Sequence, residues 1–246
     1  MRWIEIGLII ILLLGCGKAL TFDEAEALYQ NKETRDQAYA AFRPLAEKGD
    51  YRAQLRLGMY YLQKGPAQDF VKSASYFMHA AEQGDIDALY FVGSFYEDGE
   101  GLPKNLFLAE RYWLKAAEGG SYMAMFSLAR MHEYRSENSR NRSDELRKAA
   151  DWYQAAFIHG HFPSALFLWG LFTSGPLRDP LEAEAWNYAY EYAAIFEGKT
   201  TGSKPTLESL DDPIFREKAR LLGLSHLALY ARKKVPDTFL NISIGI

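Results

Sequence analysis

The sequence predicts an all-α fold, a right-handed solenoid of stacked helix pairs, on the basis of two observations. Small residues open a first helix in each of four units, and glycines close the units. The opening residues are spaced 35, 36 and 41 apart and are Ala53, Ala88, Ala124 and Ala165. The closing glycines are spaced 35, 36 and 40 apart and are Gly49, Gly84, Gly120 and Gly160. A period in the thirties with two helices per period is typical of a helical solenoid.

A targeting segment is predicted over residues 1–19, ahead of the solenoid. Residues 6–14 form an apolar run that is too short to span a bilayer comfortably. The run leads into Gly15 and Cys16, the single cysteine of the chain, in a pattern that resembles a bacterial lipobox. Cleavage before Cys16 would leave it as a lipidated N-terminus held at a membrane. Two alternatives are open, cleavage after Ala19 and an uncleaved anchor, and all three export the repeats.

Residues 21–50 are predicted to form N-terminal capping helices, an incomplete opening unit. The stretch FDEAEALYQ is amphipathic, and RDQAYAAFRPLAEKG reads as a second helix that ends at Gly49. Pro44 lies inside this second helix, where a proline can kink the backbone. Opening units of solenoids shield the first full repeat.

Residues 51–197 are predicted to form four repeats, over 51–85, 86–121, 122–161 and 162–197. In each first helix a large apolar residue follows the opening alanine by four positions, and a small residue comes next. The pairs are Leu57 and Gly58, Val92 and Gly93, Leu128 and Ala129, and Trp169 and Gly170. These positions share one helical face. Because glycine costs about 1 kcal/mol in a helix, we expect each small residue to admit a closely packed partner helix.

The second helices and the ends of the units repeat as well. A small residue is followed three positions later by an aromatic one. These pairs are Ser73 and Tyr76, Ala109 and Tyr112, Ala149 and Trp152, and Ala183 and Trp186. The closing glycine suits the left-handed C′ position that ends a helix. Asp50, Asp85 and Ser121 come directly after it and are predicted to cap the next helix.

These residues resemble the Sel1-like repeat family, a relative of the tetratricopeptide repeat, over roughly residues 35–195. The second unit follows the family pattern most closely, at Ala88, Val92, Gly93, Tyr96, Gly99, Gly101, Leu102, Pro103, Ala109, Tyr112, Ala116, Ala117 and Gly120. The first unit has a contracted turn. The third departs most, with Ala129 for glycine, His132 for tyrosine and no Gly-x-Gly turn. The resemblance implies a solenoid, and His132 is expected to be a packed core histidine.

The third unit also carries a polar insertion over residues 136–145. We expect a surface loop there; the alternative is that Arg140 and Arg142 form a basic contact for an acidic partner. The fourth unit is degenerate, with an unusually aromatic second helix. A closing helix within residues 206–234 is expected to cover the last repeat, and residues 235–246 form a tail.

Composition and motifs argue against several functional classes. The net charge of −4 does not fit a general nucleic-acid binder, which would carry a basic face. No phosphate loop, zinc-type spacing or catalytic serine motif occurs. His159 and His161 lie close together but have no further ligands nearby in sequence, so no metal site is predicted there. We therefore expect no catalytic residue, no metal site and no cofactor.

The function predicted from these features is non-enzymatic protein–protein interaction in the bacterial cell envelope. The chain would act as a lipid-anchored scaffold or regulator facing the periplasm, although a fold alone does not determine function. One alternative is an envelope enzyme or a binder of cell-wall or β-lactam-like ligands. Another is a secreted effector that binds a host protein.

A partner-binding row is predicted along the first helices, which line the concave face of helical solenoids. The positions two before and two after each large core residue lie off the core face. They are Leu55, Met59, Tyr90, Ser94, Phe126, Arg130, Phe167 and Leu171. Apolar and aromatic residues with one arginine are the composition of interface anchors. The other interpretation is that these side chains fill contacts between adjacent helices.

Overall fold

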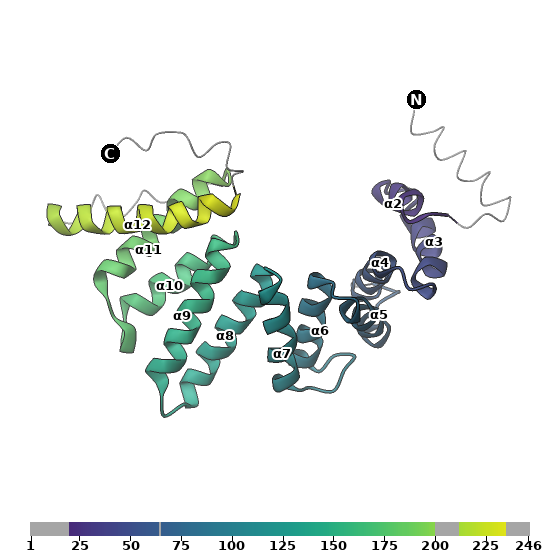
Figure 1. Ribbon diagram of the computed structural model, residues 1–246, viewed down its shortest axis with the longest axis horizontal. Coiled ribbons are helices and arrows are strands. Elements are labelled where there is room, and N and C mark those ends of the chain that lie inside the picture. The colour runs from purple at the N-terminus through teal and green to yellow at the C-terminus, as the bar shows by residue number, and fades with distance from the viewer. Residues whose placement is uncertain (1–19, 64, 200–211, 235–246) are drawn as a thin grey trace. The chain divides into compact units, whose positions relative to one another are not determined.

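A computed structural model describes residues 20–63, 65–199 and 212–234, and within these ranges every regular element is helical (Figure 1). The elements are α2 Phe22–Gln30, α3 Arg35–Glu47, α4 Tyr51–Leu62, α5 Phe70–Glu82, α6 Ile86–Asp98, α7 Leu106–Glu118, α8 Tyr122–Asn138, α9 Arg142–Ile158, α10 Ser164–Thr173, η1 Gly175–Leu177 (a 3₁₀ turn), α11 Pro180–Phe196 and α12 Pro213–Lys234. The all-α prediction is confirmed. Two compact units, Met1–Lys115 and Ala116–Ile246, are described separately below.

Three predicted features fall outside the described residues: the leader with Cys16, the segment 206–211 and the tail 235–246. Among the helices that are described, none combines the length and the apolar character needed to cross a membrane.

In unit 1 the helices pack in chain order, α2 on α3, α3 on α4, α4 on α5 and α5 on α6. The first part of its core is built on fully buried Phe42 and Leu57. Helix α3 runs unbroken through Pro44. Thr21 forms a capping box with Glu24 at the start of α2, which satisfies two backbone donors at that helix end.

The closing glycines have the predicted backbone. Their φ angles are positive, at 92° for Gly49, 87° for Gly84, 96° for Gly120 and 104° for Gly160. Each following residue donates its N–H to a carbonyl five positions earlier, for example Asp85 to Ala80 at 3.2 Å. The side chains of Asp50, Asp85 and Ser121 then accept backbone N–H groups of the next helix. The turn between units is therefore set locally.

The predicted close approaches are present at two glycines of unit 1. A Cβ on Gly93 would lie 2.4 Å from Cδ1 of Trp113, and a Cβ on Gly58 would lie 3.0 Å from the ring of Phe77. Both rings are fully buried. They come one residue after the repeated aromatics Tyr76 and Tyr112, which are only half-buried.

The register predicted for the fourth repeat is wrong by one residue. Trp169 is 39% exposed, and a Cβ on Gly170 would meet nothing within 4 Å. Ser164, Ala165 and Leu168 are fully buried instead, in the places that Ala124, Met125 and Leu128 take in the third repeat. Ser164 follows Ala124 by 40 residues, the same spacing as the closing glycines. A shift of one residue turns a helix by about 100°, which moves Trp169 to the surface.

His161 explains part of this shift, because it stands at the capping position that Asp50, Asp85 and Ser121 occupy in the other units. Its Nδ1 lies 2.8 Å from the hydroxyl oxygen of Ser164. Burial lowers the pKa of His161, so the ring is neutral at neutral pH. Helix α10 thus begins at Ser164, the first buried position.

The insertion of the third repeat lengthens two helices and does not form the expected loop. Helix α8 continues to Asn138 and α9 begins at Arg142, so only 139–141 are non-helical. His132 is buried, as predicted, and its Nδ1 lies 2.8 Å from Oε2 of Glu145 on α9. This part-buried polar pair joins α8 to the first turn of α9.

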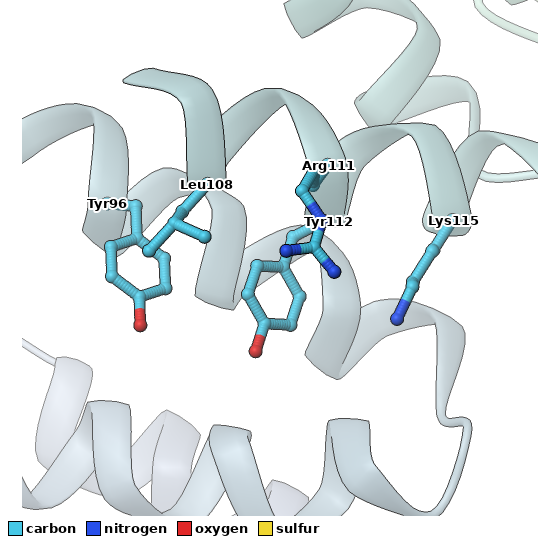
Figure 2. A pocket seen from close by; sticks show the side chains of 5 residues that line it. All are labelled: Tyr96, Leu108, Arg111, Tyr112 and Lys115. Atoms are coloured by element: carbon cyan, nitrogen blue, oxygen red, sulfur yellow. The ribbon is translucent and has the colours of Figure 1, made fainter. Parts of the chain in front are cut away.

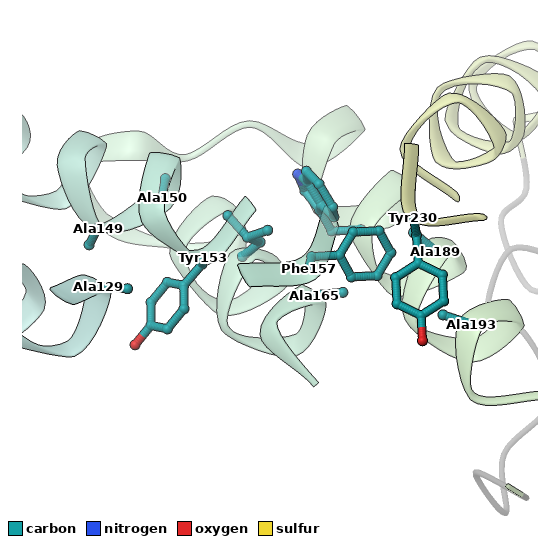
Figure 3. Packing of buried hydrophobic residues seen from close by; sticks show 11 residues of the cluster. Ala129, Ala149, Ala150, Tyr153, Phe157, Ala165, Ala189, Ala193 and Tyr230 are labelled. Atoms are coloured by element: carbon teal, nitrogen blue, oxygen red, sulfur yellow. The ribbon is translucent and has the colours of Figure 1, made fainter. Parts of the chain in front are cut away.

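In unit 2 the order of packing is α8 with α9, α9 with α10, α10 with α11 and α11 with α12. Figure 3 shows the alanines and aromatic rings of its core, with the rings of Phe157 and Tyr230 next to each other. The ring of Tyr230 on α12 is fully buried and lies 4.9 Å from Phe157. A Cβ on Gly223 would lie 2.7 Å from the carbonyl oxygen of Ala185, so α12 meets α11 backbone to backbone. Helix α12 therefore covers the last repeat, as expected of a closing helix.

Candidate functional site

A groove in unit 2 is formed by the end of α8, the start of α9, helix α10 and η1. Its volume is ≈ 440 Å³. Its lining consists of Glu133, Ser136, Glu137, Arg142, Leu146, Leu166, Phe167, Gly170, Leu171, Ser174, Gly175 and Pro176. The extension of α8 and α9 supplies one wall, so the insertion in the third repeat creates part of the groove.

The apolar wall of the groove comes from α10. Leu166 is 36% exposed and Phe167 is 39% exposed. The ring of Phe167 stacks on Tyr153 at 4.9 Å and meets Phe126 edge-on at 5.1 Å. Leu171 packs partly against the core. Phe167 is therefore held by two other rings while more than a third of its surface stays open to solvent.

The polar wall of the groove is mixed in charge. Glu133 accepts a hydrogen bond from the hydroxyl of buried Tyr153 at 2.7 Å. Burial, followed by the bond to Glu133, raises the pKa of Tyr153, so this hydroxyl stays protonated. Glu137 and Arg142 are exposed on the same wall. The groove thus offers an apolar surface beside two carboxylates and one guanidinium.

The predicted partner-binding row divides between the two units. Leu55, Met59, Tyr90 and Ser94 are half-buried in unit 1. The hydroxyl of Ser94 bonds the carbonyl of Tyr90 at 3.3 Å, and that carbonyl also accepts the indole N–H of Trp113 at 3.2 Å. The Ser94 hydroxyl and the Tyr90 carbonyl therefore take part in contacts within and between helices.

In unit 2 the structure brings Phe167 and Leu171 together in the groove. Arg130 is exposed but does not line it. Phe126 is half-buried and fills a contact between helices, 5.5 Å from Tyr153 and 4.7 Å from His161. Whether any of these residues binds a partner stays a prediction.

The sequence did not predict that Leu166, Glu133 and Glu137 line a groove. With the register corrected by one residue, Leu168 is the large core residue of the fourth repeat. The positions two before and two after it are then Leu166 and Gly170, and both line the groove. The sequence signal for this corrected register is the 40-residue spacing between the closing glycines Gly120 and Gly160. Among the residues that the structure describes, no group of three or more His, Cys, Asp or Glu side chains is placed to hold a metal ion.

Helix pairs that pack in chain order across seams of small residues define a helical-repeat protein of the tetratricopeptide-like class. The Sel1 repeat model matches residues 52–85, 86–121 and 123–161. The chain therefore contains three Sel1 repeats over these ranges, as the resemblance implied. The fourth repeat and the opening helices lie outside the matched ranges.

Known proteins resemble parts of this chain. The crystal structure of a Sel1 repeat protein from Oxalobacter formigenes matches with a TM-score of 0.57 and 25% identity, covering 70% of this chain and 71% of that chain. Two ERAD-associated E3 ubiquitin-protein ligase components of Arabidopsis thaliana, HRD3B and HRD3A, are each 37% identical, over 89 and 84 residues. Those matches cover 36% and 34% of this chain but only 15% and 12% of the relatives, so the chain spans a small part of their length.

Proposed function

We propose that this protein is a non-enzymatic scaffold that binds a protein partner in the groove of unit 2. Sel1-repeat proteins are generally protein–protein interaction scaffolds without catalytic activity. The observation that carries the proposal is the exposed pair Leu166 and Phe167 in a groove of ≈ 440 Å³. Apolar residues exposed side by side, with polar groups around them, mark interaction surfaces. A ring held rigidly by its neighbours loses little entropy when a partner covers it.

We place this scaffold in the bacterial cell envelope, held at a membrane through lipidated Cys16 and facing the periplasm. The support is the apolar run before Gly15 and the single cysteine after it. Two lipid chains suffice for stable anchoring, since each buried CH₂ contributes about 0.8 kcal/mol. The partner then belongs to the envelope, where the anchored repeats can reach it.

Site-specific photo-crosslinking in the native cells tests the groove. A benzophenone amino acid at Phe167 should trap one discrete protein, identified by mass spectrometry. The matched control is the same amino acid at Phe196 on α11, which is 56% exposed and lies outside the groove. Equal crosslinking from both positions, or none from Phe167, would reject the groove as the binding site.

A further inference from the structure

A small cavity in unit 1 gathers two cations and two tyrosines on α6 and α7. Its volume is ≈ 90 Å³, and its lining consists of Tyr96, Leu108, Arg111, Tyr112 and Lys115. Figure 2 shows the two hydroxyls and the charged ends of Arg111 and Lys115 pointing to the same side of the helices. Each polar group of the lining can donate a hydrogen bond, and the lining contains no carboxylate.

The two cations of this lining are Arg111 and Lys115. Within the described part of the chain, neither Arg111 nor Lys115 forms an ion pair or a hydrogen bond, and both are exposed. Burial, then the nearby Tyr96 and Glu82, raises the pKa of Tyr112, so its hydroxyl remains a donor at neutral pH. The lining thus carries two positive charges and no negative one, with Glu82 nearby, in a protein whose net charge is −4.

The preceding repeat carries the same pair of tyrosines in the same geometry. The rings of Tyr96 and Tyr112 lie 5.7 Å apart with 19° between their planes. Those of Tyr61 and Tyr76 lie 5.8 Å apart with 3° between their planes. The stacked pair is therefore a feature of the repeat, and it does not by itself distinguish the second repeat.

The charge does distinguish the second repeat. In the first repeat, Lys72 pairs with Asp69 at 2.9 Å, and Asp69 caps α5. The corresponding cap of α7 is the uncharged Asn105, whose side-chain oxygen accepts the N–H groups of the first turn at 3.1 Å. Asp69 thus neutralises Lys72 in the first repeat, where exposed Arg43 also acts on Tyr76, whereas in the second repeat Arg111 and Lys115 both lie beside the tyrosine pair without a carboxylate in the lining.

We propose that this cavity binds an acidic segment of a protein partner, with a Glu or Asp carboxylate entering between Arg111 and the tyrosine hydroxyls. A guanidinium binds a carboxylate through two parallel hydrogen bonds, and Lys115 can pair with the next acidic residue of the segment. A volume of ≈ 90 Å³ equals roughly three water molecules, which suits a carboxylate. Nucleobases stack on open aromatic faces, but here the two rings face each other. The proposal does not depend on the groove of unit 2.

Fluorescence anisotropy with the full chain and a fluorescein-labelled hexaglutamate peptide tests it. Arg111→Glu with Lys115→Glu should weaken binding about tenfold or more, since it replaces both charge-assisted contacts with repulsion. Lys32→Glu with Lys104→Glu changes the net charge equally at two exposed loop positions and should leave the affinity unchanged. Tyr112→Phe keeps the ring and removes one donor, and should weaken binding about two- to fivefold.

Several outcomes would overturn the proposal. One is the same loss of affinity in both charge-reversed variants, because binding would then reflect net charge alone. Another is equal binding of a labelled hexaglutamine peptide. Tighter binding of a short oligothymidylate that requires Arg111 and Lys115 would replace the peptide by a nucleic acid as the ligand. Circular dichroism of each variant, expected to match the wild type, confirms that these exposed substitutions leave the fold intact.

Discussion

Glycine-to-alanine substitution at three helical positions provides the sharpest test of the packing. At Gly93 the new Cβ would lie 2.4 Å from Cδ1 and 2.5 Å from Nε1 of Trp113. Ordinary contacts between carbon atoms begin near ~3.5 Å, so the indole would have to move by about 1 Å. Trp113 is fully buried and donates to the carbonyl of Tyr90 at 3.2 Å, so movement of the indole also breaks this part-buried hydrogen bond.

These contacts set the loss in the free energy of unfolding. Overpacking costs about 1–3 kcal/mol and loss of the hydrogen bond about 1–3 kcal/mol, while the better helix propensity of alanine returns about 1 kcal/mol. Gly93→Ala should therefore destabilise unit 1 by about 1–5 kcal/mol. At Gly170 nothing lies within 4 Å of the new Cβ, so the only expected effect is the stabilisation from the better helix propensity of alanine. Gly58→Ala should fall between them, because Phe77 is at 3.0 Å.

Thermal and urea unfolding, followed by circular dichroism, measure the difference. A change of 1 kcal/mol shifts the Tm of a chain of this size by about 2–4 °C. Gly93→Ala should lower the Tm by at least about 2–4 °C, and Gly170→Ala should raise it slightly. If the two substitutions shift the Tm in the same direction, the packing described for α6 and α10 is wrong.

Three further predictions concern other parts of the chain. The mature protein should carry a lipid-modified Cys16 in a bacterium with lipoprotein processing, and an unmodified Cys16 in the intact mass would refute this. The hydrogen bond with His132 lowers the pKa of Glu145 below its usual 4.5. The stability that ionised Glu145 contributes is therefore present above about pH 4.5, and it is lost as the pH falls through the lowered pKa of Glu145. Glu145→Gln should therefore flatten the acid limb of a stability profile, and an unchanged limb would show that the pair contributes nothing. Phe126→Ala should lower the Tm because its ring lies between packed helices, whereas Phe167→Ala should reduce partner capture about tenfold with a smaller Tm change; the reverse pattern would move the binding surface to Phe126.

Much of the repeat architecture could be read from the sequence, because its signals are local. The closing glycines adopt positive φ at the ends of the repeat units, and Asp50, Asp85 and Ser121 directly after three of them cap the next helix. The pairing of a small residue with a bulky neighbour predicted close approach at Gly58 and Gly93, where the structure places Phe77 and Trp113. Backbone preference and spacing along one helix determine such features without any knowledge of the partner helix.

The register of α10, the groove and the charged cavity were decided only by the tertiary structure. The 41-residue alanine spacing and the 40-residue glycine spacing predict different core faces for the fourth repeat. The choice between them depends on which residues α9 and α11 bury, and Leu168 is enclosed while Trp169 is not. Likewise, Arg111 and Lys115 look like ordinary surface charges in the sequence. Their availability depends on distances to carboxylates on other helices, which a one-dimensional pattern does not contain.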